Sequence, residues 1–182
     1  MVLLKASFTR SEKEWLWAIY KRAFSADPSE TAQEQLCYTR STFFRSLLDR
    51  DYRKFVCVDR TGTIRAFAFL TNNLKKARVA YMRPERFVLM APNFRGRIFY
   101  MTTICVDPEV NGRGYAVEIL ADVLMFLDRR NAIGAFDYAS EKIQSWQPLL
   151  DRIVSRLRAK GQITREAWQY RIVGRQEYAI YG

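Results

Sequence analysis

The sequence predicts a single α/β domain, and three observations lead to this prediction. The chain has 182 residues, which is enough for one sizeable hydrophobic core and short for two. Along it, segments typical of strands and helices follow in the order strand, two helices, hairpin, strand-turn-helix, strand-helix and closing hairpin. Hydrophobic residues make up 49% of the chain and aromatic residues 14%, which favours a packed globule over disorder. We therefore expect one domain over residues 1–182.

The stretch 97–130 organises the rest of the chain. Residues 98–106 are β-branched or aromatic with almost no charge, which predicts a strand buried on both faces. Asp107 and Pro108 end this strand. A helix is expected to begin near Gly112 to Gly114, because apolar residues then recur at helical spacing at Val117, Ile119, Leu120, Val123, Leu124 and Leu127.

The turn before this helix is a candidate anion site. The first N–H groups of a helix have no intrahelical acceptor and carry the positive end of the helix dipole. Gly112 and Gly114 would let a ligand approach the backbone closely. Phosphate is the anion that suits such a site best. The alternative is an ordinary structural turn, since glycine is common in turns.

The order of residues around the turn favours the phosphate interpretation. Residues 106–116 read V-D-P-E-V-N-G-R-G-Y-A. This run resembles the acyl-CoA-binding motif of the Gcn5-related N-acetyltransferase superfamily, in which a strand ending in Val-x-Pro leads to Arg/Gln-x-x-Gly-x-Gly/Ala. The matching residues are Val106, Pro108, Gly114 and Ala116, whereas Asn111 stands where Arg or Gln is usual.

This resemblance implies a mixed β-sheet that is splayed open at its middle and flanked by helices. It also implies acetyl-CoA as acyl donor and no metal. The strand backbone around Ile104 and Val106 would pair with the pantetheine arm. The pyrophosphate would be held by the turn residues Asn111, Gly112, Arg113, Gly114, Tyr115 and Ala116.

The remaining elements are expected from their periodicity and turn residues. Thr9 or Ser11 can cap a helix in which Trp15, Ile19, Ala23 and Phe24 share a face. A second helix over 30–49 would bury Leu36, Phe43, Phe44, Leu47 and Leu48. The other predicted elements are a strand at 2–8, a hairpin of 55–58 with 64–70, a strand at 135–139, a helix at 148–160 ended by Gly161, and a closing hairpin over 168–181.

A basic insert at about 72–97 separates the hairpin from the central strand. Its charged residues include a single acid, Glu85, and the bases Lys75, Lys76, Arg78, Arg83, Arg86 and Arg95. We expect an extra short strand or helix here, or a flap over the site. Basic residues interleaved with aromatic ones can bind a phosphate backbone and stack on bases. The alternative is that the apolar residues dock on the core and the charges face water.

The usual catalytic groups of the resembling family are missing where its motif would place them. That family often has a Glu on the central strand and a Tyr about four residues before the end of the later helix. Here the strand offers no acid, and Leu157 occupies the Tyr position. Tyr138, Glu141 and Ser145 are the substitutes that we consider, with Ser145 donating to the thioester sulfur. Their alternative roles are a packed aromatic for Tyr138 and a solvated carboxylate for Glu141.

The balance of charges bears on the partners of the protein. Lys and Arg number 30 against 19 Asp and Glu, which gives a net charge of +11. Such a balance favours nucleic acid, an anionic cofactor or an acidic protein, or it merely keeps the surface solvated. The apolar run in residues 1–10 is too short for a signal peptide, and no segment approaches the roughly 18 apolar residues of a membrane span. We therefore expect a cytoplasmic protein without a membrane partner.

Cys37, Cys57 and Cys105 form no CxxC pair, and the sequence contains no His to pair with a metal or a thiol. All three are interpreted as small core residues, although the resemblance would place the strand of Cys105 beside a thioester.

Two functions follow from the sequence. The first is an N-acetyltransferase that moves an acetyl group from acetyl-CoA to an amine acceptor by direct attack in a ternary complex. The acceptor would be a protein, a small molecule or an aminoacyl-RNA. The alternative is a catalytically inactive protein of the same fold whose basic surface contacts nucleic acid or an acidic partner.

Overall fold

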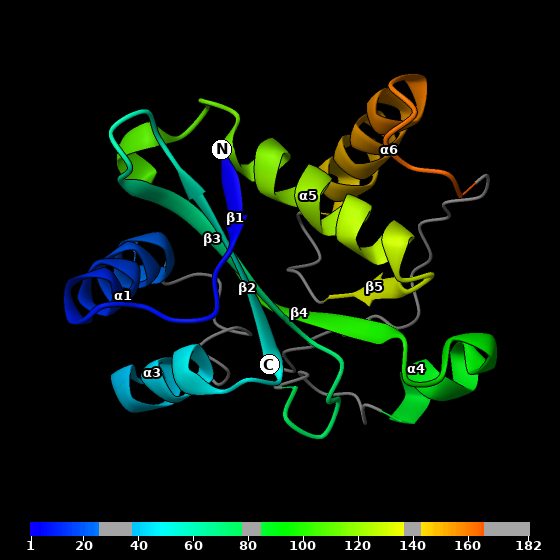
Figure 1. Ribbon diagram of the computed structural model, residues 1–182, viewed down its shortest axis with the longest axis horizontal. Helices are drawn as coiled ribbons and strands as arrows, with labels where there is room; N and C mark the ends of the chain where they lie inside the picture. The colour runs from blue at the N-terminus through cyan, green and yellow to red at the C-terminus, as the bar shows by residue number, and fades with distance from the viewer. Residues whose placement is uncertain (26–37, 78–84, 137–142, 166–182) are drawn as a thin grey trace, which may run out of the picture.

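A five-stranded sheet with the strand order β1-β2-β3-β4-β5 forms the centre of the molecule (Figure 1). It is seen in a computed structural model that describes residues 1–25, 38–77, 85–136 and 143–165. The strands are β1 (Val2–Leu4), β2 (Tyr52–Val58), β3 (Ile64–Thr71), β4 (Ile98–Val106) and β5 (Ile133–Ala135). The first four pair antiparallel and β5 pairs parallel with β4, so the sheet is mixed.

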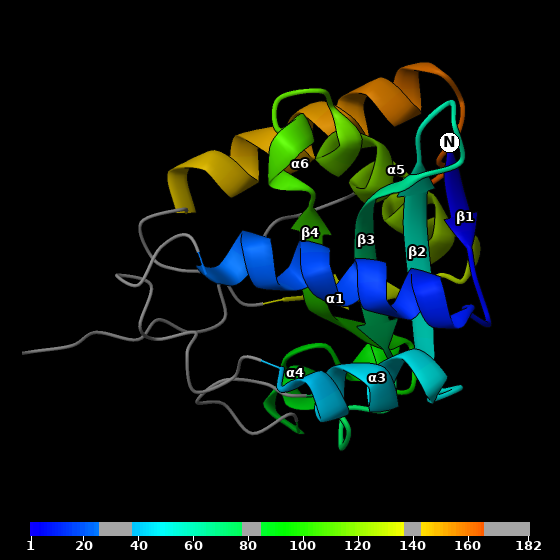
Figure 2. The same ribbon diagram turned by 90° about the vertical axis from the view of Figure 1, so that its left-hand side faces the viewer.

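Helices cover both faces of this sheet (Figures 1 and 2). One face is covered by α1 (Arg10–Ser25) and α3 (Arg40–Leu48), and the other by α5 (Tyr115–Arg129), against which α6 (Ile143–Ala159) packs. The shorter helices are α4 (Glu85–Met90), η1 (Pro92–Phe94) and η2 (Pro108–Val110). The predicted fold class, a mixed sheet flanked by helices, is thereby confirmed.

Each face of the sheet has its own apolar cluster. On the α1 side, Phe43 lies among the rings of Tyr20, Phe67 and Phe69. On the α5 side, Phe126 meets Phe55 and Phe99 edge to face. Because β2 and β3 contribute side chains to both clusters, these strands are buried on both faces and anchor the sheet.

The start of α1 agrees with the sequence prediction. The Thr9 N–H donates to Glu12 Oε2 at 2.8 Å, and the Glu12 N–H donates to Thr9 Oγ1 at 3.2 Å. This reciprocal pair is a capping box, which satisfies backbone donors that the helix leaves without a partner. The predicted hairpin is also confirmed, with Gly62 at φ +82° in its turn.

Three predicted boundaries on the N-terminal half need correction. The first strand ends at Leu4 instead of residue 8. The described part of the second helix starts at Arg40, and Leu36 lies outside the described residues. Leu48, which was expected to be buried, is 66% exposed, because the buried face of α3 passes through Phe43 and Leu47 and the next residue is rotated by about 100° from it.

Two boundaries on the C-terminal half also differ. The strand predicted at 135–139 begins at Ile133, because Gly134 is a strand residue rather than a turn residue. A Cβ atom at Gly134 would lie 3.0 Å from Leu127 Cδ1, so the glycine permits close packing of β5 on α5. The last described helix begins at Ile143, and Pro148 lies inside it instead of at its start. Residues 137–139 and the predicted closing hairpin at 168–181 lie outside the described residues.

The insert contains the expected extra helix, and its described part docks on the core. Phe87 of α4 is buried against Ile98 and Tyr100, with its ring centroid 5.8 Å from that of Tyr100. Lys76 forms ion pairs with Asp49 at 2.7 Å and Asp51 at 2.8 Å. Phe87, Val88 and Phe94 of the insert therefore pack on the core as the alternative interpretation predicted, whereas Leu89 and Met90 are exposed. Lys76 serves a contact within the protein.

Candidate functional site

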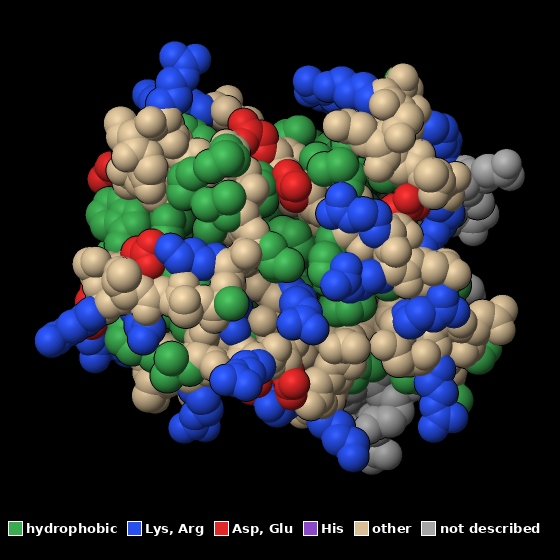
Figure 3. All heavy atoms as spheres, viewed as in Figure 1, with side chains coloured by type: hydrophobic (Ala, Val, Ile, Leu, Met, Phe, Trp, Pro, Cys, Tyr) green, Lys and Arg blue, Asp and Glu red, His purple; other side chains and the backbone are tan. Residues whose placement is uncertain are grey.

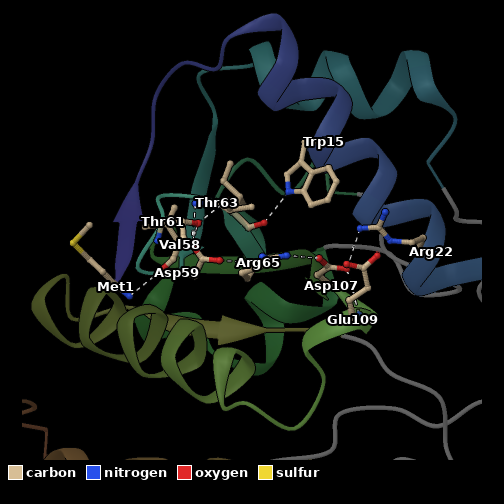
Figure 4. Close-up of polar contacts among 11 residues, drawn as sticks. Met1, Trp15, Arg22, Val58, Asp59, Thr61, Thr63, Arg65, Asp107 and Glu109 are labelled. Carbon is tan, nitrogen blue, oxygen red and sulfur yellow. Dashed lines mark hydrogen bonds and ion pairs between the residues drawn. The ribbon is translucent and has the colours of Figure 1, made fainter.

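A fully buried carboxylate holds the junction between β4 and the turn. Asp107 accepts from Arg22 Nη2 at 2.9 Å and from Arg65 Nη1 at 3.3 Å (Figure 4). The Arg65 Nε group also donates to Asp59 Oδ2 at 2.7 Å, which extends the network to the β2–β3 turn. Arg22 comes from α1 and Arg65 from β3, so one side chain ties two other elements to the end of β4. The sequence analysis treated Asp107 only as a strand end.

The same residue shapes the backbone that follows. Its N–H donates to the Arg65 carbonyl at 2.7 Å, and its own carbonyl accepts from the Val110 N–H at 3.0 Å. Its carboxylate also accepts from the Glu109 N–H at 3.4 Å, so it caps the short helix η2. The position of the turn at 111–114 is therefore fixed relative to the sheet.

The glycine turn lies exposed at the N-terminal end of α5. Asn111, Gly112, Arg113 and Gly114 are exposed, while Tyr115 and Ala116 are half-buried. Gly112 and Gly114 have φ values of +78° and +84°, a conformation that glycine adopts without strain. A Cβ atom on either glycine would meet no atom within 4 Å, so the surface around the turn is open.

The first backbone bond of α5 runs from the Glu118 N–H to the Gly114 carbonyl at 3.0 Å. The N–H groups of Tyr115, Ala116 and Val117 therefore precede the hydrogen-bonded ladder at the positive end of the helix dipole. The structure thus brings the six turn residues that the sequence predicted together at one helix end.

The central strand has an open edge next to this turn. β5 pairs with β4 only from Ile98 to Tyr100, and no strand among the described residues pairs with Met101 to Val106 on that side. Ile104 and Val106, the other predicted cofactor residues, lie on this stretch and are half-buried against the α5 side of the sheet. The sheet is therefore splayed at its middle, as the resemblance implied.

An irregularity in β4 marks the place where the splay begins. Phe69 pairs with Thr103 and Leu70 with Met101, which leaves Thr102 as an extra residue. The hydroxyl of Tyr38 donates to Thr102 Oγ1 at 3.0 Å, and Tyr38 is buried. The sequence analysis did not single out Tyr38, and no local pattern could have found it, because its partner lies 64 residues away.

No contact among the described residues links the predicted catalytic residues Tyr138, Glu141 and Ser145 to the glycine turn or to the open edge of β4. Tyr138 and Glu141 lie outside the described residues. Ser145 belongs to the first turn of α6, a helix that the sequence prediction started later. Leu157 is buried in the cluster between α5 and α6, so the position of the family's Tyr is occupied by a packing residue.

Both described cysteines are buried and carry no reactive thiolate. Burial, and in second place a hydrogen bond to Glu118, raises the pKa of the Cys57 thiol to about 12. Burial likewise raises the pKa of Cys105 to about 12. Their interpretation as core residues is confirmed, whereas Cys37 lies outside the described residues.

The chain is similar to several proteins of known structure, although not to any known sequence family. No protein-family model and no curated protein sequence matches the chain. Among solved structures, an aminoglycoside acetyltransferase from an uncultured soil metagenomic sample, in complex with sisomicin, has a TM-score of 0.56 at 9% identity and covers 100% of this chain and 96% of its own. The ribosomal-protein-S18-alanine N-acetyltransferase of Escherichia coli has a TM-score of 0.54 at 16% identity and covers 84% and 76%.

Gcn5 of Tetrahymena also matches, with a TM-score of 0.51 at 11% identity over 81% of this chain and 75% of its own. The chain has the fold of the Gcn5-related N-acetyltransferases. Its open β4 edge and glycine turn thus occur within an acetyltransferase fold. In the part of the chain that the structure describes, no cluster of His, Cys, Asp or Glu is placed to hold a metal ion, and no helix is long and apolar enough to cross a membrane.

The Asp107 network gives a prediction about stability. Asp107→Asn removes a fully buried charge and leaves Arg22 and Arg65 without their shared partner, so it should lower the free energy of unfolding by about 3 kcal/mol. Urea denaturation measures this loss. Glu14→Gln, which removes the exposed pair with Arg40, is the control and should cost less than about 1 kcal/mol. Equal losses in the two variants would show that Asp107 does not hold the junction.

The cysteine environment gives a second prediction. In a Cys37→Ser variant, a thiol-specific disulfide reagent at pH 8 should leave Cys57 and Cys105 unmodified in the folded protein, because a raised pKa keeps both thiols protonated and burial denies access. Both should react at once in denaturant. Rapid labelling of the native protein would contradict the assigned burial.

Proposed function

We propose that this protein is an acetyl-CoA-dependent N-acetyltransferase acting on an amine acceptor. The observation that carries the proposal is the open edge of β4 running directly into the glycine turn at the start of α5. An extended pantetheine arm requires such a free strand edge, and a pyrophosphate requires such a helix end. The fold shared with N-acetyltransferases of known structure supports the same conclusion.

The residues present fit the donor in different ways. The backbone at Ile104 and Val106 would pair with the arm. The amides from Gly112 to Ala116 would hold the pyrophosphate, and Arg113 would add a charge-assisted bond. Asn111 is exposed in the turn and offers a neutral amide in place of the longer Arg or Gln of the motif.

The reaction needs a neutral amine at the thioester carbonyl. A lysine-like amine with a pKa of about 10.4 loses its proton at a cost of roughly 4 kcal/mol near pH 7.4. We propose that Glu141 accepts the proton of the attacking amine, that Ser145 donates to the departing sulfur, and that Tyr138 is a further candidate for the donor. Tyr38, which precedes α3 and donates its hydroxyl to Thr102 of the central strand at the splay, is a further phenol beside that strand and acts as a positioning residue.

A second candidate function is a protein that keeps the fold without turnover. The burial of Leu157 at the position of the family's Tyr favours it. Under this alternative the basic surface would bind nucleic acid or an acidic partner. The compartment that we propose for either function is the cytoplasm.

Donor binding gives the third prediction. Acetyl-CoA at about 100 times its dissociation constant should stabilise the protein by roughly 2.7 kcal/mol and raise the unfolding midpoint by several degrees. Gly114→Trp should abolish this shift, because it blocks the turn. Gly62→Trp is a matched control: Gly62 has nearly the same φ, +82°, and equally open surroundings, but it lies in the β2–β3 turn. If the thermal shift is lost equally in both variants, or is absent in the wild type, the proposed donor site is wrong.

Catalysis gives the fourth prediction. Glu141→Gln should lower kcat by about 100-fold for any amine that is acetylated, because a general base typically contributes 10²-fold or more. Glu109→Gln, an exposed acid beside the turn, is the control and should leave kcat unchanged. Steady-state kinetics across pH 6 to about 9 measures both. If the Glu141→Gln enzyme keeps the wild-type pH profile, Glu141 is not the general base.

A further inference from the structure

An arginine patch lies at the C-terminal end of α5, at the other end of the helix from the glycine turn. It consists of Arg95, Arg97, Arg129, Arg130 and Arg165, which come from separate stretches of the chain. They converge on Asn131: Arg97 Nη1 donates to its carbonyl at 2.8 Å, and Arg165 Nη2 donates to its Oδ1 at 3.4 Å. Arg129 and Arg130 directly precede Asn131, and Arg95 lies two residues before Arg97.

Three of the five guanidinium groups of the patch are held in place by aromatic rings or by oxygen atoms of Asn93 and Asn131. Arg97 and Arg165 lie over the Phe94 ring, at 5.4 Å and 5.7 Å from its centroid. Arg130 lies over Phe126 at 4.1 Å, and Arg97 Nη2 also donates to the Asn93 carbonyl at 2.7 Å. Such contacts reduce the entropy that a flexible side chain loses on binding, so the patch is preorganised.

Four of the five arginines of the patch form no ion pair within the described residues. Within the described part of the chain, none of Arg95, Arg97, Arg129 and Arg130 pairs with an acid. By contrast, Arg22, Arg40 and Arg65 on the α1 side all have acidic partners. Two acids of α5 lie near the patch. The Asp128 carboxylate accepts from the Thr164 and Arg165 N–H groups at 2.9 Å and 3.1 Å, and Asp122 interacts electrostatically with Arg129 without forming an ion pair.

Figure 3 shows that Lys and Arg side chains are spread over this face of the molecule, including the side that holds the C-terminal end of α5. A concentration of like charge is unfavourable unless a counter-charge binds it. Since the cations of the patch are all arginines, their planar donor groups suit phosphate better than lysine would.

We propose that the arginine patch binds the phosphate backbone of a nucleic acid. A protein partner would be expected to bury exposed aromatic or aliphatic side chains at the centre of its interface. The aromatic ring within this patch, Phe94, is half-buried beneath two guanidinium groups instead. The exposed apolar residues Leu89 and Met90 belong to α4 and are not part of the patch. Within the patch itself the charge surrounds no exposed apolar centre, which is the pattern of backbone contacts that position a nucleic acid without reading its sequence.

The patch is separate from the proposed donor site. The 15 residues of α5 span about 22 Å, so a CoA pyrophosphate at Gly112 to Ala116 would not reach the arginines at the other end of the helix. The two proposals therefore stand or fall independently.

The test uses the full chain and two labelled probes, a single-stranded RNA and a duplex DNA of about 20 units each, at a series of salt concentrations. The wild type should bind at least one probe with an affinity that falls steeply with salt. Arg95, Arg129 and Arg130, each changed to Gln, should weaken binding about 10-fold or more at low salt. For RNA this change should reduce the slope of log K against log salt by about 2, because each lost phosphate contact removes roughly 0.7.

A matched variant separates the patch from net charge. Arg10, Lys21 and Arg60 are exposed on the α1 side and on the β2–β3 turn, and their change to Gln removes the same charge. This control should bind nearly as the wild type does, and the patch variant should keep both its circular dichroism and its acetyl-CoA thermal shift. Equal weakening in both variants, failure of both probes to bind, or binding to polyglutamate in preference to nucleic acid would each overturn the proposal.

Discussion

The pairing of one buried carboxylate with two arginines decides where the candidate site lies. Asp107 has no exposed surface, so its charge is tolerated only because Arg22 and Arg65 reach it. Arg65 and Asp107 are also joined through their backbones. The pairing thus adds a polar contact to the apolar packing of α1 on β4 and places it where β4 enters the turn. The position of the exposed turn residues therefore depends on the ion pairs of a carboxylate that is buried.

The irregularity at Thr102 explains why the sheet opens where it does. An extra residue on one strand increases the local twist and bends the strand. β4 parts from β5 immediately after Tyr100, one residue before the irregularity, and from there the strand runs along its neighbour β3 alone. The free edge thus begins where the three-residue strand β5 ends, next to the irregular register of β4 against β3. The unpaired stretch of β4 ends at Asp107, and the glycine turn and the N-terminal end of α5 follow directly. Within the described part of the chain, unpaired backbone polar groups therefore lie at both the strand edge and the helix end.

Much of this arrangement was predictable from the sequence. The limits of β4 and the turn were found because a charge-free β-branched run, a proline and paired glycines give strong local signals. The start of α6 was wrong because Pro148 was interpreted as a first-turn residue, although a proline can lie inside a helix at the loss of one hydrogen bond. The limits of β5 were wrong because Gly134 has a packing role against Leu127 that only the fold reveals. The Tyr38–Thr102 bond and the ion pairs of Asp107 join residues far apart in sequence, so no local pattern indicated them.

The two ends of α5 carry partial charges of opposite sign, and each end lies beside one of the two proposed sites. The N-terminal end carries a partial positive charge that favours an anion at the glycine turn. The C-terminal end carries a partial negative charge, which stabilises Arg129 and Arg130 by about 0.3–1 kcal/mol each and offsets part of their mutual repulsion. The helix therefore lets arginines accumulate at one end without destabilising the fold, while their outward N–H groups keep their capacity to bind phosphate. Because salt screens exposed charges over about 8 Å, the field of the patch decays well before it reaches the turn. An anion held at either end of α5 would accordingly have little influence on binding at the other, and a donor and a nucleic acid could occupy the protein together.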